Sequence, residues 1–436
     1  MNEKRWLKID RTTMFSLLIG IGLLLFNATL RSKISQSIIF AFNIPVYIAF
    51  LLFLPKAPRM GRTSKKFIKK LIVWLVLLSI MLVSMVRSNA IKITFIIAIA
   101  IPIIIGLIEL KDCRDIVRVF SVWLKILNVV LFLVAVGGLI DLISGYSVTK
   151  FFTEFYHTEA ILQMRIDEPS RIISVLGHPL VSSEIGLIGC ICNYIDAVSL
   201  KTTKHQISKF LVSMVVIALC GSKIAFVLAL FLMLLLNIEN RKLRNIILAV
   251  ILIYILYAVG MFDVVLERFV NGIKSGDLTT GRNVRFAELY SAGALRFSFF
   301  SGHGQELSEH FIIALEYPAL RLSYRYGIFY TICLFGTIFV YPLVTVLRRK
   351  QLFLFWALLC LIVDVNTFSS LAATGDGMLI YNVMIFLFMN ISKFCYRTTR
   401  YKAKLNAKEG KIDENLCVEP KLVYVGRDPK SFSNIV

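Results

Sequence analysis

Charged residues are scarce in this chain of 436 residues. Lys, Arg, Asp and Glu make up 17% of it, whereas soluble globular proteins contain about a quarter. Hydrophobic residues account for 57%, and the mean hydropathy is +0.76. This composition excludes an ordinary soluble domain. We expect an all-α polytopic membrane protein that crosses its membrane many times.

Several signatures of enzymes and metal sites are absent. The sequence contains no HExxH metal motif, no Walker loop and no GxSxG nucleophile motif, which argues against an ATP-driven pump and a serine hydrolase. The 8 cysteines are scattered, and Cys190 and Cys192 match neither a CxxC pair nor a zinc spacing. No cofactor and no metal site is therefore expected. Residues 1–11 are charged, but no small-residue cleavage site follows the first apolar run, so this run is expected to remain as a span.

Acids are the scarcest charges, with 27 Asp and Glu against 49 Lys and Arg, giving a net charge of +22. In a membrane protein such an excess collects in cytoplasmic loops, so it does not indicate nucleic-acid binding. Most of the Lys and Arg fall in alternate loops and at both ends of the chain, which predicts cytoplasmic N- and C-termini. The tail, 393–436, is basic, and we expect it to be a flexible cytoplasmic anchor to anionic lipid.

Twelve apolar stretches are long enough to be drawn as spans of about 20 residues each. The run 207–236 is interrupted only by Gly221, Ser222 and Lys223, so a single tilted helix with eleven spans overall is the alternative. Two helices place the basic loops on either side of this run on the same face, which favours twelve. The predicted spans are 12–30, 34–54, 68–86, 91–108, 116–143, 179–199, 207–220, 223–236, 246–263, 318–347, 352–367 and 378–393.

The predicted organisation is one transmembrane bundle, 1–392, followed by the tail. Two segments outside the cytoplasm are long, 144–178 and 264–317. The first mixes aromatic and charged residues, which is typical of an interfacial helix or a lid. The second overlaps the polar stretch from Thr279 to Gly327, where arginines, acids and histidines are densest.

Ionisable residues at membrane depth are candidates for function because burying them is costly. Glu184 lies within a predicted span, after His178, and its role is either functional or helix packing. Asp141, Asp263 and Asp364 lie near predicted helix ends, where water can reach them, and are interpreted as structural.

Cationic residues cluster near the predicted outer surface. Lys223 lies at the break in the run 207–236 and can hold an anion, although an ordinary interfacial lysine is the alternative. Arg282 and Arg285 open a predicted helix that extends to Leu295, where guanidinium groups and the helix dipole both favour phosphate. Two more arginines, four residues apart, share a helix face, namely Arg321 and Arg325.

Three side chains in the polar stretch can accept a proton. They are Glu316, His310 and His303, and their distances to a substrate cannot be read from the sequence. His303 stands between two glycines, so the alternative is that it only occupies a turn.

These residues resemble those of the bacterial O-antigen polymerase and ligase superfamily, which includes capsular repeat-unit polymerases. CGSKIAF resembles the family's Ser-Arg break, with Lys223 in place of the arginine, and TTGR resembles its loop arginine, at Arg282. SGHG resembles its GxG turn. In EYPALRLSYRYGIF, Glu316 and Tyr317 replace a His-Asn pair, which disfavours a ligase and favours a polymerase. The resemblance covers roughly 177–327 with the flanking helices.

The resemblance implies a location in the bacterial cytoplasmic membrane. It also implies a metal-independent glycosyl transfer between oligosaccharides linked to undecaprenyl pyrophosphate, on the outer face of that membrane. It implies catalytic roles for Arg282 and for Glu316 or His310, which would take the proton from the attacking hydroxyl. Lys223, Arg285, Arg321 and Arg325 would bind the pyrophosphate. Membrane lipids, a chain-length regulator and a flippase are the partners implied. The rival functions are a lipid-linked oligosaccharide flippase, against which the long outer segment and the lack of repeats argue, and an O-antigen-type ligase.

Overall fold

The computed structural model describes residues 10–34, 42–53, 64–89, 91–110, 114–167, 171–240, 282–304 and 316–408, with isolated residues between 254 and 276. In these ranges the regular elements are helices, and the only bridge pairs Ser174 with Gly177. The all-α prediction is confirmed for this part of the chain. His310, Asp263 and nearly all of the predicted span 246–263 lie outside the described residues.

The described part of the chain contains a series of α-helices. In chain order they are α1 (Arg11–Gly20), α2 (Ala28–Ile34), α4 (Ile44–Phe53), α5 (Ser64–Arg87), α6 (Ile93–Phe95), α7 (Ile101–Leu107), α8 (Arg114–Ser144), α9 (Ser147–Tyr156), α10 (Glu159–Asp167), α11 (Pro179–Ile195), α12 (Gln206–Leu219), α13 (Lys223–Asn240), α16 (Arg282–Ser291), α18 (Pro318–Tyr326), α19 (Ile328–Phe335), α20 (Tyr341–Arg348), α21 (Leu352–Val365) and α22 (Gly377–Lys408). Short π-helical segments extend or join some of them, at η1 (Ile21–Leu25), η3 (Ile96–Ala100), η4 (Asp196–Leu200) and η6 (Gly336–Val340).

Five described helical segments are long and apolar enough to cross a membrane, or six if α1 and α2 are counted as one bent span. This supports a multi-pass membrane protein. Four further apolar helices are shorter, at Ile93–Leu107, Gln206–Leu219, Lys223–Leu236 and Leu352–Val365. The total of twelve spans stays a prediction.

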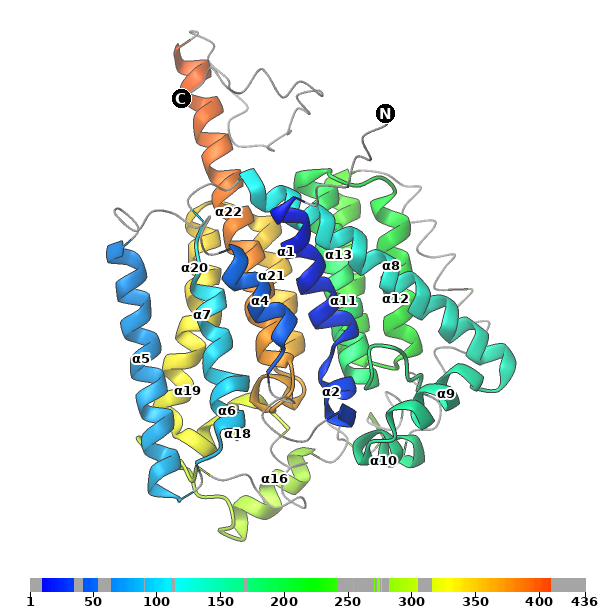
Figure 1. The fold of residues 1–436 in the computed structure, drawn as a ribbon, viewed down its shortest axis with the longest axis vertical. Coiled ribbons are helices and arrows are strands. Elements are labelled where there is room, and N and C mark those ends of the chain that lie inside the picture. The colour runs from blue at the N-terminus through cyan, green and yellow to red at the C-terminus, as the bar shows by residue number, and fades with distance from the viewer. Residues whose placement is uncertain are drawn as a thin grey trace, which may run out of the picture.

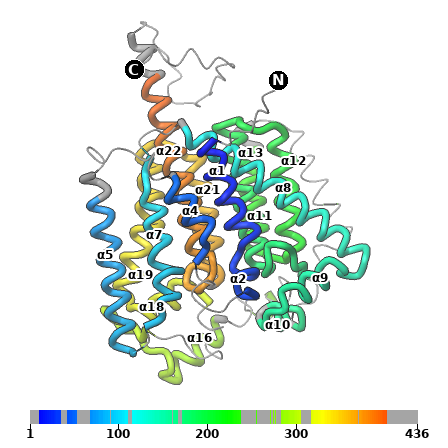
Figure 2. The backbone as a smooth tube through the Cα atoms, viewed as in Figure 1, coloured from blue at the N-terminus to red at the C-terminus, as the bar shows by residue number. Residues whose placement is uncertain are grey.

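The helices form an upright bundle with two different ends (Figure 1). One end carries the start of α1 and the far end of α22, and we call it the α22 end. The opposite end carries α2, α9, α10, α16 and α18, and we call it the α16 end. The tube in Figure 2 shows the chain passing back and forth between these ends. Both long polar segments of the sequence therefore have described helices at the same end, opposite the start of α1 and the far end of α22.

The centre of the bundle is formed by α11 and α22, whose residues are mostly buried, whereas α5 lies at the side and exposes much of its surface. A helix that is apolar on all sides is suited to such a central position. Close packing around α11 requires small residues. A Cβ at Gly189 would collide with Leu131 of α8 and Ser213 of α12, so glycine lets the three helices approach.

The run 207–236 consists of two helices, as the twelve-span prediction requires. Helix α12 ends at Leu219, and Gly221 has a φ of +67° in the turn, a conformation that favours glycine. Lys223 is the first residue of α13.

Two predicted spans are wrong in detail. The first does not run to residue 30, because the helix ends after Leu25 and α2 follows at 71° to it. Residues 318–347 are not one helix either, because Gly327, with a φ of +96°, separates α18 from the apolar helix that starts at Ile328. In both places a short helix is left at the α16 end of the bundle (Figure 1).

Two helix ends also differ from the prediction. Helix α16 ends at Ser291, before the predicted end at Leu295. Helix α22 does not stop at the predicted boundary of the bundle but continues through Lys408, so the first part of the basic tail is helical. Residues 409–436 lie outside the described residues.

Candidate functional site

Buried charges gather around the connection between α21 and α22. This connection, 366–376, includes the 3-10 turn η7 (Ser369–Ala372) and lies at the α16 end of the bundle; we call it the 366–376 loop. Side chains from three distant parts of the sequence contact it. Arg31 binds Asp376, Arg325 binds the carbonyl of Ala372, and Glu184 accepts a hydrogen bond from Ser370.

Arg31 and Asp376 form a buried ion pair. The Arg31 guanidinium donates from Nη1 and Nη2 to the two carboxylate oxygens of Asp376 at 2.9 Å and 2.8 Å. Nη1 also donates to the carbonyl of Phe26 at 2.7 Å, in the bend between η1 and α2. Such a planar two-bond geometry makes a strong charge-assisted contact. The pair therefore fixes the bent helix to the start of α22.

Arg325 lies inside the protein, with 1% of its surface exposed. Its Nη1 donates to the carbonyl of Ala372 at 2.7 Å, and its guanidinium carbon lies 4.4 Å from the centre of the Phe95 ring. Arg321, one turn earlier on α18, is also buried. These two predicted pyrophosphate-binding residues thus lie at the same end of the bundle as α16, and Arg325 holds the 366–376 loop against α18.

Two sequence motifs of the predicted site pack against each other. The backbone N–H groups of His303 and Gly304 donate to the carbonyls of Tyr324 and Arg325, both at 2.8 Å. A Cβ at Gly302 would collide with the backbone of Arg325, so glycine is needed for this close approach. The turn at 301–304 is therefore seated along the second half of α18.

The predicted proton acceptors occupy different positions. Glu316 precedes α18 by two residues, and its Oε2 is buried. His303 is exposed, and its ring stacks on Tyr324 with the ring centres 4.4 Å apart. Its Nε2 is 2.8 Å from the carbonyl oxygen of Arg296. These contacts favour the simpler interpretation of His303, namely that it occupies a turn and does not act as a proton acceptor.

The remaining predicted cations lie at the same end of the bundle. Arg282 is the first residue of α16 and Arg285 follows one turn later, exposed. Lys223 is half-buried at the start of α13, in the break between two apolar helices.

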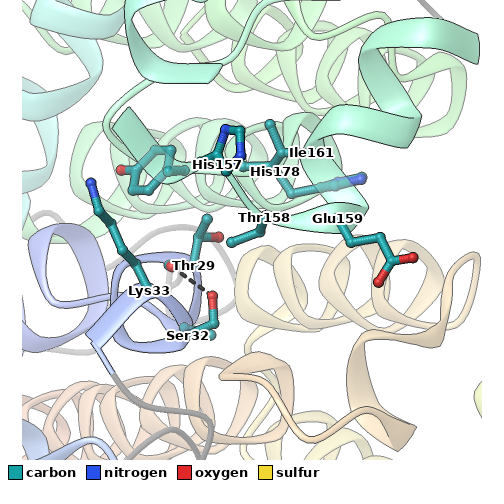
Figure 3. A pocket seen from close by; sticks show the side chains of 10 residues that line it. Thr29, Ser32, Lys33, His157, Thr158, Glu159, Ile161 and His178 are labelled. Atoms are coloured by element: carbon teal, nitrogen blue, oxygen red, sulfur yellow. Dashed lines mark hydrogen bonds between the residues drawn. The ribbon is translucent and has the colours of Figure 1, made fainter. Parts of the chain in front are cut away.

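A pocket of 640 Å³ opens at the α16 end beside α2 (Figure 3). Most of its lining residues carry a polar group, among them an amine, two imidazoles, a carboxylate and several hydroxyl groups, although most of the lining surface is apolar. The lining residues are Ala28, Thr29, Ser32, Lys33, Tyr156, His157, Thr158, Glu159, Ile161 and His178. Lys33 donates to the carbonyl of Phe155, and its amine lies 4.0 Å from the centre of the Phe155 ring.

The pocket adjoins an apolar surface. Phe151 and Phe155 of α9 are exposed, and their rings stack with centres 6.2 Å apart. At the adjoining end of α8, Leu139, Ile140 and Ile143 are also exposed. Exposed aromatic residues next to an apolar helix are typical of the region between lipid and water. Helix α9 is consistent with the interfacial helix predicted in 144–178. Tyr156, at its end, lines the pocket.

His178 forms the start of α11. Its Nδ1 accepts a hydrogen bond from the backbone N–H of Leu180 at 3.2 Å, which caps the helix. Burial, together with the nearby Arg171, lowers the pKa of His178 from its ordinary value of 6.5 to about 4. At neutral pH the ring is therefore uncharged, with Nδ1 accepting and Nε2 carrying the proton.

This depressed pKa predicts a loss of stability in acid. Above pH 6.5 the ring is neutral in both the folded and the unfolded chain. As the pH falls from 6.5 toward 4, the unfolded chain binds a proton and the folded chain does not, so folding weakens by about 3 kcal/mol. His178→Asn keeps a capping side chain without the titration. Unfolding midpoints of both proteins between pH 7 and about 4 should therefore converge in acid, and a constant difference between them would contradict this prediction.

Glu184 lies on α11 beneath the 366–376 loop, with 1% of its surface exposed. The Ser370 hydroxyl donates to its Oε2 at 3.3 Å. Asp364, in the last turn of α21, is also buried, so the expectation that water reaches it is wrong. The same holds for Asp141, which is 1% exposed although it lies near the end of α8 as predicted.

Within the described ranges, no group of three or more His, Cys, Asp and Glu side chains is placed to hold a metal ion.

No known protein family, characterised protein or solved structure matches this chain.

Three parts of this site were not predicted from the sequence. Arg31 and Asp376 lie 345 residues apart in the chain and could not be paired without the fold. Ser370 lies in a short polar segment that has no motif to distinguish it. The pocket is formed largely by α2 and the chain between α9 and α10, and its only residue among the predicted candidates is His178. Asn27 could have indicated the break between η1 and α2. Its side chain caps α2 by accepting a hydrogen bond from the backbone N–H of Leu30.

Proposed function

We propose that this protein joins lipid-pyrophosphate-linked oligosaccharide units into a polymer by metal-independent glycosyl transfer at the α16 end of the bundle. The observation that carries the proposal is the pocket beside α2, most of whose lining residues carry polar groups, next to the exposed phenylalanines of α9. A substrate with a sugar head and a polyprenyl tail needs both surfaces side by side. The α16 end would then face away from the cytoplasm, in agreement with the distribution of Lys and Arg.

The cations of this end suit the diphosphate of such a substrate. Arg282 and Arg285 lie at the start of α16, Lys223 at the start of α13, and Arg321 on α18. In the proposed reaction a sugar hydroxyl of one unit attacks the anomeric carbon of the other, and the bond to the lipid pyrophosphate breaks. Negative charge grows on the leaving phosphate, where fixed cations are most effective. Glu316 takes the proton of the attacking hydroxyl, with His310 as the second candidate.

A transporter of the same lipid-linked units is the second candidate function. The bend of 71° between α1 and α2 and the buried acids below the 366–376 loop favour it, because broken helices and buried charges occur in substrate paths of transporters. A ligase is less favoured, because Glu316 stands where the family it resembles has a histidine.

One experiment separates these functions. The purified full chain is incubated with purified lipid-linked repeat units, without nucleotide or added metal, and the products are resolved by size. We expect a ladder of longer lipid-linked chains. In parallel, the protein is placed in sealed vesicles and movement of the units across the bilayer is measured. Movement without any elongation would replace the polymerase by the transporter, and transfer only to an added foreign acceptor would indicate a ligase.

Glu316→Gln is expected to lower the polymerisation rate by about 10²–10⁴-fold, because it removes the proposed general base while keeping the side-chain shape. His303→Ala should stay close to wild type, because the imidazole stacks on Tyr324 at the surface. Glu288→Gln, on the exposed side of α16, is the matched control for loss of an acid. Initial rates with saturating substrate give the comparison, and equal rates for the Glu316 and His303 variants would remove Glu316 from this role.

A further inference from the structure

Two buried acids have no ionic partner among the described residues. Glu184 of α11 and Asp364 of α21 are 1% and 2% exposed, on helices that pack against each other. Oε1 of Glu184 and Oδ2 of Asp364 are both buried without a hydrogen-bond donor in the described structure. Burying a single carboxylate charge in this way is costly, and burying two near each other is more so.

Two other buried acids, Asp141 and Asp196, are surrounded by hydrogen-bond donors. Asp141 accepts hydrogen bonds from the backbone N–H groups of Val148 and Thr149 and from the Thr149 hydroxyl, at 2.7–3.1 Å. Asp196 accepts from the N–H and hydroxyl groups of Thr202 and Thr203, at 2.7–3.0 Å. Such donor sets stabilise a negative charge. From the residues that the structure describes, Glu184 receives only the Ser370 hydroxyl at 3.3 Å, which is too little for a buried ionised carboxylate.

Within the described part of the chain, no positive charge compensates that of Glu184. The charged groups that act on it are Asp364 and, farther along the 366–376 loop, Asp376. Asp376 is already neutralised by Arg31. The neighbouring helices present Ile217 and Ser213 from α12 and Leu131 from α8 to the glycines that follow Glu184 on α11.

We propose that Glu184 and Asp364 together hold one proton at neutral pH, forming a protonation site beneath the 366–376 loop. A carboxylate of the pair takes up one proton and becomes a neutral acid, which relieves both the burial of charge and the repulsion between the two groups. This site goes beyond the proposed glycosyl transfer and is equally compatible with transport. Loss of the proton would place two negative charges next to Ser370, in the loop that Arg31 and Arg325 hold.

Infrared spectroscopy of the purified full chain tests the site. A protonated carboxyl group gives a carbonyl band above the amide region that shifts in heavy water. We expect this band in the wild type at pH 7 and its complete loss in the double variant Glu184→Gln with Asp364→Asn, whose amides copy the shape of neutral acids. Asp141→Asn and Asp196→Asn are the matched controls, and each should keep the band. Absence of the band in the wild type, or its survival in the double variant, would overturn the proposal.

A second experiment covers failure of the double variant to fold. Should the double variant not fold, dicyclohexylcarbodiimide, which reacts with protonated carboxyl groups in apolar surroundings, is applied to the wild type. An adduct located on Glu184 or Asp364, with none on Asp141 or Asp196, supports the pair. Adducts on neither member would refute it.

Discussion

Arg282→Ala is expected to lower polymer formation by about 10²–10³-fold, the cost of removing one fixed group that stabilises charge in the transition state. Single lipid-linked repeat units should accumulate, because their supply does not depend on this residue. Arg282 is the first residue of α16, at the end of the bundle where the pocket opens. In the proposed reaction a positive charge at a helix start would favour the anionic leaving group. The measurement is the chain-length distribution of lipid-linked glycan, in cells and with the purified protein.

Two variants make this result specific to the site. Arg282→Lys keeps the charge but loses the planar fork, and we expect an intermediate rate. Arg348→Ala removes an exposed arginine from the α22 end and should leave polymer length unchanged. Normal polymer from the Arg282→Ala protein would exclude Arg282 from the mechanism, whatever the function of the other cations.

Asp376→Asn is expected to destabilise the fold by about 3–5 kcal/mol, because it leaves the buried Arg31 guanidinium without its negative partner. The loss should appear as a lower unfolding midpoint of the purified protein and as less folded protein recovered from membranes. Replacing both partners by apolar residues, Arg31→Met with Asp376→Leu, should recover most of the stability, since no charge is then buried.

The exposed pair of Asp10 and Arg118 provides the matched control. Their side chains are 3.0 Å apart, but 37% and 61% of their surfaces are exposed. Such a pair contributes about 0–1 kcal/mol, so Asp10→Asn should hardly change the midpoint. An Asp376→Asn protein as stable as the Asp10→Asn protein would show that the buried pair does not hold the bent helix in place.

The helical class and most segment positions could be predicted because apolar runs alone determine where a helix can be buried in lipid. The break at Gly221 was recognisable from three small or polar residues within an apolar run. The break at Gly327 was not, since Tyr326 and Ile328 continue the apolar pattern on both sides. There the backbone of 298–304 forms hydrogen bonds with the end of α18 and with the first residues of α19. This tertiary contact fixes the break.

The candidate site was predictable only as a region. The density of arginines and acids indicated the α16 end through Arg282, Glu316 and Arg325. The fold was needed to show that Arg325 is enclosed by Phe95 and Ala372, and that Arg31 has a buried partner. Contacts between residues hundreds of positions apart leave no local pattern in a single sequence. Glu184 was identified by its depth, but Asp364 was assigned to water because position near a helix end does not reveal what covers it.

Some residues of helix α2 line the pocket, and another forms the ion pair with Asp376. Thr29, Ser32 and Lys33 line the pocket, while Arg31, between them in the sequence, binds Asp376. A rigid helix of 7 residues cannot move one set without the other. Any ligand that shifts α2 on entry must also strain or relax the 366–376 loop, and by thermodynamic reciprocity a change in that loop alters how tightly the ligand is held.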